Sequence, residues 1–131
     1  MTIAKRNIFI TGLFLFFCGF TKNLYAEEVA VEWAPFVKRT NISDKQLVIA
    51  ANLVNSEFLI KQKGFIKREL IKKNDKEYAD VIHWQTKADA ITASEKVNTC
   101  VVCGDYFKLM KMEVKTGEGF SYYTIIKNWE S

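Results

Sequence analysis

The sequence has few of the residues from which disulfide frameworks, metal sites and flexible linkers are built. Its 131 residues include one proline, one histidine and three cysteines. A small domain held by several spaced disulfides needs more cysteines, and the histidine with the two cysteines outside the N-terminal segment cannot supply the four ligands of a zinc site. The single proline, together with the lack of a low-complexity linker or an internal repeat, indicates one compact domain and no metal.

The first 26 residues have the layout of a secretory signal peptide. Lys5 and Arg6 form a short positive segment, an apolar run of 13 residues spans Ile8–Phe20, and Ala26 is a small residue at the expected cleavage point. This run is shorter than the roughly 20 residues that cross a bilayer as a helix. We therefore expect a mature chain of residues 27–131 that is periplasmic or secreted. An uncleaved anchor is the alternative, because Leu24 is larger than the residue preferred before a cleavage site.

Removal of this segment leaves a nearly neutral domain. The whole chain carries 19 lysines and arginines against 15 acidic residues, and residues 1–26 hold three of the basic residues and none of the acidic ones. A strongly basic surface is the electrostatic signature of nucleic-acid binding, and the mature chain does not have one. We expect no nucleic-acid partner.

The hydrophobic patterns of residues 27–131 predict a single α+β domain in which strands and helices alternate. Apolar alternation predicts strands, and apolar residues at helical spacing predict helices. The predicted elements are a strand over 29–37, a helix over 43–64, a hairpin of strands 65–71 and 78–84, a helix over 86–97, further helical turns over 100–110 and a strand over 120–129. The order β-α-β-β-α-β is the ferredoxin-like plan.

Capping signals support the first helix. Ser43 is a typical N-cap and Gln46 completes a capping box three residues later, while Gly64 is suited to a C-cap. The residues that form the buried stripe recur at helical spacing and are Leu47, Ala50, Ala51, Val54 and Phe58.

The register of the hairpin decides which side chains share a face of the sheet. A two-residue turn at Asn74-Asp75 would place Arg68 on the same face as His83 and on the face opposite Trp84. A longer turn would shift the pairing by one residue and exchange these partners. The sequence leaves both registers open.

Two segments resemble a known family. KQKGFIKRELIKK and EYADVIHWQTKADAITASEKV are similar to the antibiotic-biosynthesis-monooxygenase-like (ABM) branch of the dimeric α+β barrel superfamily, and the resemblance covers residues 43–110. It implies a homodimer in which two ferredoxin-like sheets face each other, with a pocket between the sheet and the helices of each protomer. Such pockets hold flat or apolar molecules. Some members oxygenate aromatic compounds without metal or flavin, and other relatives degrade haem.

The haem-degrading relatives can be compared residue by residue. They pair an asparagine on the first strand with a tryptophan at the end of the third strand and a histidine on the following helical segment. Trp84 matches the tryptophan, but the strand over 29–37 has no asparagine and no histidine follows His83. We therefore expect no haem and no other cofactor.

Three residues of the hairpin are candidates for a ligand site. His83 could act as a general base that removes a phenolic proton, or it could simply pack within the sheet. Trp84 could form a stacking wall for an aromatic ligand, or belong to the core. Arg68 could anchor a carboxylate, or form an ion pair with Glu69 or Asp80. No second catalytic group accompanies them in the sequence.

Cys100 and Cys103 form a Cys-x-x-Cys motif at the expected start of a helical turn. In an exported protein this pair could be a structural disulfide, two buried thiols or a redox pair. Covalent haem attachment would need a histidine after the second cysteine, where Gly104 stands.

The sequence therefore predicts an exported, dimeric α+β barrel protein that binds a small apolar or aromatic molecule. Its most specific hypothesis is a cofactor-independent monooxygenase with His83 as base, Trp84 as ligand wall and Arg68 as anchor. The alternatives are a non-enzymatic binding or structural module of the envelope and a thiol-redox protein that uses Cys100 and Cys103.

Overall fold

The computed structural model describes residues 28–111 and 119–131, so the predicted signal peptide lies outside the described residues. The elements alternate as predicted. They are β1 (Ala30–Lys38), α1 (Asp44–Glu57), the 3₁₀ turn η1 (Leu59–Lys61), β2 (Phe65–Lys72), β3 (Glu77–Trp84), α2 (Lys87–Lys96), the 3₁₀ turn η2 (Val97–Thr99), α3 (Val101–Phe107), β4 (Met110–Lys111) and β5 (Ser121–Thr124).

The strands form one antiparallel sheet with the order of a ferredoxin-like domain, which confirms the predicted fold class. The order is β2-β3-β1-β4, and β5 also pairs with β1. Strands β4 and β5 lie one after the other along the same edge of β1, at Val37–Lys38 and at Ala30–Trp33 respectively. The final strand is therefore shorter than the predicted range of 120–129, because its ladder ends at Thr124.

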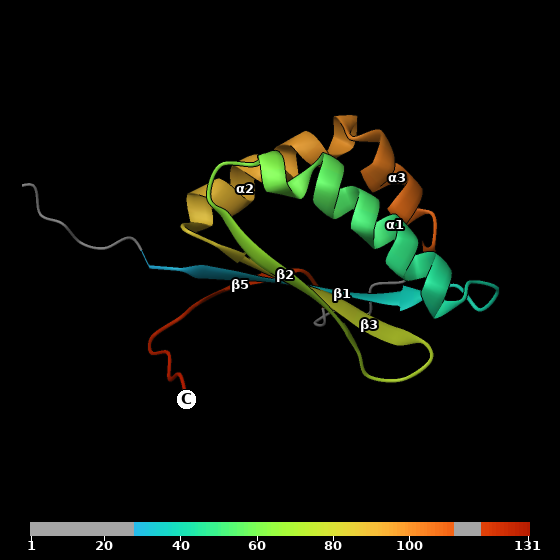
Figure 1. Cartoon of the computed structure of the whole chain (residues 1–131), viewed down its shortest axis with the longest axis horizontal. Helices are drawn as coiled ribbons and strands as arrows, with labels where there is room; N and C mark the ends of the chain where they lie inside the picture. The colour runs from blue at the N-terminus through green and yellow to red at the C-terminus, as the bar shows by residue number, and fades with distance from the viewer. Residues whose placement is uncertain (1–27, 112–118) are drawn as a thin grey trace, which may run out of the picture.

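All the helices cover one face of the curved sheet (Figure 1). Helix α1 begins with the predicted capping box, in which the Gln46 amide donates to Ser43 Oγ at 3.2 Å and the Ser43 amide donates to Gln46 Oε1 at 2.9 Å. The helix ends earlier than predicted, at Glu57, and the turn η1 follows it. Gly64 adopts a positive φ of 79° in the turn that precedes β2 instead of capping α1.

The hairpin has the longer turn. The β2–β3 register predicted from a two-residue turn is therefore wrong. Arg68 pairs with Ile82 and Lys67 with His83, and the strands are joined by residues 73–76. The Asn74 side chain accepts the Lys76 and Glu77 amides at 2.9 Å, which stabilises this four-residue turn. The shift brings Arg68 to the helix-covered face with Trp84 and leaves His83 on the other face.

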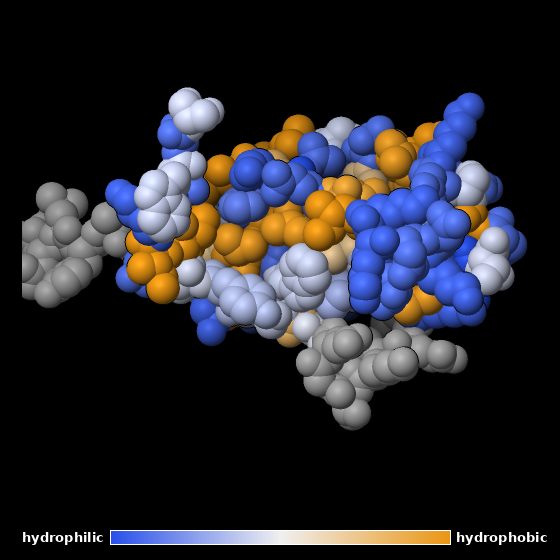
Figure 2. Space-filling view, turned by 90° about the horizontal axis from the view of Figure 1, so that it is seen from below, coloured by the Kyte–Doolittle hydropathy of each residue, from blue (hydrophilic) through white to orange (hydrophobic). Residues whose placement is uncertain are grey.

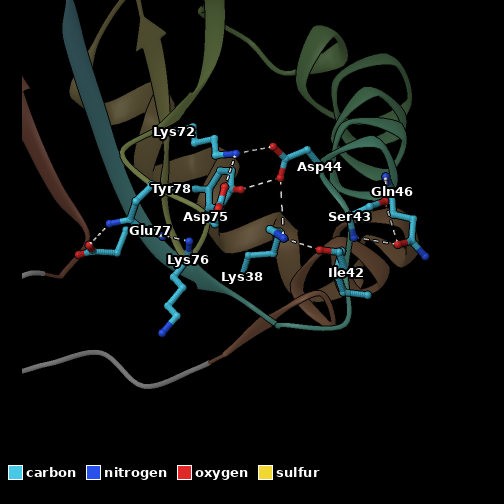
Figure 3. Close-up of polar contacts among 11 residues, drawn as sticks. Lys38, Ile42, Ser43, Asp44, Gln46, Lys72, Asp75, Lys76, Glu77 and Tyr78 are labelled. Atoms are coloured by element: carbon cyan, nitrogen blue, oxygen red, sulfur yellow. Dashed lines mark hydrogen bonds and ion pairs between the residues drawn. The ribbon is translucent and has the colours of Figure 1, made fainter.

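A polar network joins the tip of the hairpin to the start of α1 (Figure 3). Asp44 accepts hydrogen bonds from Lys72 Nζ at 2.8 Å and from the Tyr78 hydroxyl at 2.6 Å. Lys38 at the end of β1 lies 3.7 Å from the same carboxylate and donates to the Ile42 carbonyl. The hydrogen bond from Lys72 lowers the pKa of Asp44, so the carboxylate stays charged and links α1 to β1, β2 and β3.

The other face of the sheet carries no helix. Seen from that side, an apolar band crosses the middle of the molecule between hydrophilic margins (Figure 2). Val31, Trp33 and Val37 of β1 point to this face, since the residues that alternate with them face the helices, and they are only partly buried. His83 and Tyr123, which both pair with Val31 from neighbouring strands, lie on the same face.

Candidate functional site

A cavity of about 220 Å³ lies between the sheet and the three helices. Its size is somewhat below that of most ligand pockets, which suits a small ligand. Most of its wall is apolar and much of it is aromatic. The lining residues are Glu32, Ala34, Val54, Phe58, Leu59, Arg68, Asp80, Ile82, Trp84, Ala93, Ser94, Val97, Cys103, Tyr106, Phe107 and Phe120.

Glu32 of β1 is a buried carboxylate in the wall of this cavity, with 7% of its surface exposed. Trp84 Nε1 donates a hydrogen bond to Glu32 Oε2 at 2.8 Å. Burial raises the pKa of Glu32 to about 7, and the nearby charge of Asp80 adds to the rise, while the Trp84 hydrogen bond and Arg68 oppose it. Near neutral pH this group is therefore poised between proton donor and proton acceptor.

Asp80, in contrast, accepts a hydrogen bond on each carboxylate oxygen from side chains on the same face of the sheet. Arg68 Nε donates to Asp80 Oδ1 at 2.7 Å, and the Tyr106 hydroxyl donates to Asp80 Oδ2 at 3.0 Å. Burial raises the pKa of Tyr106, which stays protonated and keeps donating this bond. The three side chains link β2, β3 and α3 and form part of the cavity lining.

Arg68 is a structural cation of this network. Besides Asp80 it donates from Nη1 to the Ala51 carbonyl of α1 at 2.8 Å, and its guanidinium lies 5.0 Å from the centre of the Tyr106 ring. Burial alone would lower the pKa of Arg68, but the hydrogen bond and the charge of Asp80 outweigh it and raise the pKa. The ion pair with Asp80, one of the alternatives in the sequence, is thus present.

Trp84 is fixed in the wall of the cavity. It is 1% exposed, its ring meets that of Phe65 edge to face at 5.8 Å between centroids, and its indole N–H is bound to Glu32. The irregularity in β2 between Phe65 and Lys67 makes this contact possible, because it returns Phe65 to the face of Trp84.

The structure separates His83 from the other two predicted site residues. Trp84 and Arg68 line the cavity, whereas His83 does not and lies on the opposite face of the sheet. There His83 Nε2 is 3.4 Å from Glu69 Oε2. A base that acts inside this cavity must come from another residue.

Glu32, Asp80 and Tyr106 are the functional candidates that sequence reasoning missed. The signal for Glu32 is a charged residue between Ala30 and Ala34 in an otherwise apolar strand. This signal is weak, because Val31 and Trp33 on the other face of the strand are more apolar than Ala30 and Ala34. For Tyr106, nothing in the sequence ties the residue to the hairpin.

Cys100 and Cys103 form a disulfide at the start of α3, with Cα atoms 5.2 Å apart. Cys103 is 1% exposed and lines the cavity, whereas Cys100 is partly exposed and does not line the cavity. Of the three arrangements considered for the motif, buried free thiols are therefore wrong.

Within residues 28–111 and 119–131, no cluster of three or more potential ligands could hold a metal ion. The described part of the chain also has no helix that is long and apolar enough to span a membrane. The chemistry available in the cavity is that of an acid or base at Glu32, an aromatic wall and a fixed ion pair.

No protein-family model matches this sequence, and a comparison with curated proteins finds no similar one. Solved structures do resemble the fold. A putative antibiotic biosynthesis monooxygenase from Nitrosomonas europaea has a TM-score of 0.57 at 11% identity, over 76% of this chain and 92% of that one. A variant of SnoaB, a cofactor-independent oxygenase from Streptomyces nogalater, has a TM-score of 0.55 at 13% identity, over 80% and 97%.

A dimeric ferredoxin-like protein from an uncultured marine organism has a TM-score of 0.50 at 12% identity, over 81% of this chain and 95% of that one. Identities this low relate folds and leave activities open. With its ferredoxin-like topology, this chain has the fold of the antibiotic biosynthesis monooxygenases, an ABM-like domain.

Proposed function

We propose that this protein binds a small aromatic molecule in the cavity and oxygenates it without a cofactor. The observation that carries the proposal is Glu32, a buried carboxylate with a pKa of about 7 in a cavity lined by aromatic side chains. A general base works best when its pKa is near the working pH, and an apolar pocket is where such a shift arises. The fold shared with an oxygenase supports the reaction class.

Glu32 takes the role that sequence reasoning gave to His83. The ionised carboxylate accepts the proton of a hydroxyl group on the aromatic ring, which leaves an electron-rich anion that reacts with dioxygen. One oxygen atom then enters the ring system and the other leaves as water, with the electrons supplied by the ligand itself. Trp84 positions Glu32 through its indole N–H and also forms part of the wall against which the ring packs.

We propose that two copies associate through the helix-free face of the sheet. Trp33, Val31 and Val37 lie there only partly buried, and the apolar band of Figure 2 is the kind of surface that a partner covers. A neighbour with the same fold that is described as dimeric supports a dimer, and the choice of face rests on the apolar residues. The proposed location of the dimer is the periplasm or the exterior of the cell, on the basis of residues 1–26.

The test is binding and oxygen consumption with a panel of one- and two-ring quinols and naphthols. The wild-type protein should quench or shift the fluorescence of a bound naphthol and consume dioxygen at a rate that rises with pH around 7. Glu32→Gln should retain binding, because its amide oxygen can still accept from Trp84, and lose turnover. Glu69→Gln, the same change at an exposed position outside the cavity, is the matched control and should keep both.

Turnover that survives Glu32→Gln would refute the base, and failure of every aromatic probe to bind would refute the cavity as a ligand site. Binding without oxygen consumption by the wild type would favour the second candidate, a non-enzymatic binding module. The hydrogen bonds from Arg68 and Tyr106 to Asp80 support that alternative. They occupy both oxygens of Asp80, which leaves Glu32 without a second carboxylate that could take part in catalysis.

A further inference from the structure

The disulfide has an accessible side and a buried side. Cys103 packs in the core with 1% of its surface exposed, whereas Cys100 is partly exposed where η2 meets α3. The two cysteines therefore differ in exposure, and Cys100 is the one that an incoming thiol would attack. Exposed disulfides are more easily reduced than buried ones.

A groove of about 310 Å³ lies beside the accessible sulfur. Its apolar surface comes from Phe58, Val101 and Val102, and Lys96 and Glu57 add one charge of each sign. Val101, next to Cys100 in the chain, is 78% exposed and leaves an apolar surface next to the bridge. The groove is lined by Cys100 and the ligand cavity by Cys103, and Phe58 lines both.

A hydrogen-bond donor and a positively charged side chain lie near Cys100. The Cys103 amide donates to Cys100 Sγ at 3.2 Å, and Lys96 contributes a positive charge to the same groove. The bridge also joins residues only three apart in the chain, so it removes little freedom from the unfolded state. Its contribution to stability is thus at the low end for disulfides.

We propose that Cys100 and Cys103 form a redox-active disulfide that oxidises the thiols of a short cysteine-containing peptide or dithiol bound in the groove. This activity is separate from the proposed oxygenation and does not depend on it. Glutathione, a cysteine peptide of three residues, is the probe of the same chemistry.

The exchange is balanced without any other reactant. The thiolate of the substrate attacks Cys100 Sγ, the bond between Cys100 and Cys103 breaks, and Cys103 leaves with the electron pair and takes a proton from solvent. A second substrate thiol then attacks the substrate sulfur of the mixed disulfide and releases Cys100. The substrate gains a disulfide, and its two electrons and two protons end on Cys100 and Cys103 as thiols.

The first experiment treats the full-length oxidised chain with excess reduced glutathione, followed by alkylation and peptide mass mapping. Mapping separates the pair from Cys18, which lies in the N-terminal segment. We expect both Cys100 and Cys103 to become reduced, in proportion to the ratio of reduced to oxidised glutathione. A bridge that stays closed in excess glutathione would overturn the proposal.

The second experiment uses Cys103→Ala, with Cys103→Ser as a second variant if alanine in this buried position impairs folding. Oxidised glutathione should form a mixed disulfide on Cys100, and iodoacetamide at pH 6.5 should modify Cys100 about fivefold or more faster than it modifies glutathione. Lys96→Gln in this background should slow the alkylation, and Lys63→Gln, a lysine outside the groove, should not. Reaction at the rate of glutathione itself would overturn the proposal.

Naphthol binding, measured on the same samples, separates the two proposals. A protein that binds naphthol but keeps an inert bridge would refute the redox role alone. A protein that exchanges thiols but binds no aromatic probe would refute the ligand cavity alone.

Discussion

Replacing Glu32 by glutamine should make the protein more stable in alkaline solution than the wild type. The carboxylate is 7% exposed, accepts one hydrogen bond from Trp84 and lies near the charge of Asp80. Glutamine has the same shape, offers the same acceptor oxygen to the indole and carries no charge. The substitution therefore removes the cost of burying a charge and changes little else.

The magnitude follows from the shift of the pKa of Glu32 from 4.5 to about 7. Because the folded protein holds this proton more tightly than the unfolded chain, the group favours folding when protonated. Its stabilising effect is complete below about pH 4.5 and is lost progressively as the pH rises to about 7. At about 1.4 kcal/mol per pKa unit, the loss amounts to at most about 3–4 kcal/mol.

Urea denaturation at a series of pH values from 4.5 to 9, followed by tryptophan fluorescence, measures this effect. Relative to Glu32→Gln, the wild type should lose about 2–3 kcal/mol between these limits, with most of the change below pH 7. Glu69→Gln, a substitution on the exposed part of β2, is the control for a general loss of negative charge. Parallel pH profiles for the wild type and Glu32→Gln would refute the assignment of the raised pKa to Glu32.

Three further substitutions test the packing. Asp80→Asn leaves the charge of Arg68 buried without its counter-ion and should lower the free energy of unfolding, measured in urea, by about 3–5 kcal/mol. An Arg68→Met/Asp80→Leu double variant should restore much of this loss. An Asp80→Asn variant as stable as the wild type would contradict the buried ion pair. Gly64→Ala combines a positive φ with a collision against the Asp89 carboxylate and should cost about 1–3 kcal/mol, seen as a lower Tm; an unchanged Tm would contradict this strain. Trp33→Glu places a charge on the helix-free face and should convert the proposed dimer to monomer in sedimentation velocity; a dimer that survives would show that another surface is used.

Sequence patterns were most reliable where a signal is local. The capping box at Ser43 needs only residues within one helical turn, and the N-cap at Thr86 likewise sets the start of α2. Both helices begin where predicted for that reason. The end of α1 was predicted less accurately, because the packing of Phe58 and the turn η1 decide where this helix stops and no single residue marks it.

The candidate site depended on a register that the sequence left open. A shift of one residue in the pairing of β2 with β3 separates an arrangement with Arg68 and His83 on one face from one with Arg68 and Trp84 on one face. The hydrogen bonds from the Lys76 and Glu77 amides to the Asn74 side chain stabilise the longer turn. Asparagine is compatible with turns of several lengths, so its presence in the sequence does not predict which length forms.

Local sequence determined the order of the elements, the α+β class and the starts of the helices, because hydrophobic period and capping act within a few residues of chain. Only the tertiary structure decided which face of β1 is covered by helices, since the covered face carries Glu32 and Lys38 and the open face is the more apolar one. That choice buries Glu32 and raises its pKa, and it places His83 on the open face. A pKa near neutrality is a property of burial and of neighbours distant in sequence, so it arises only when the chain has folded.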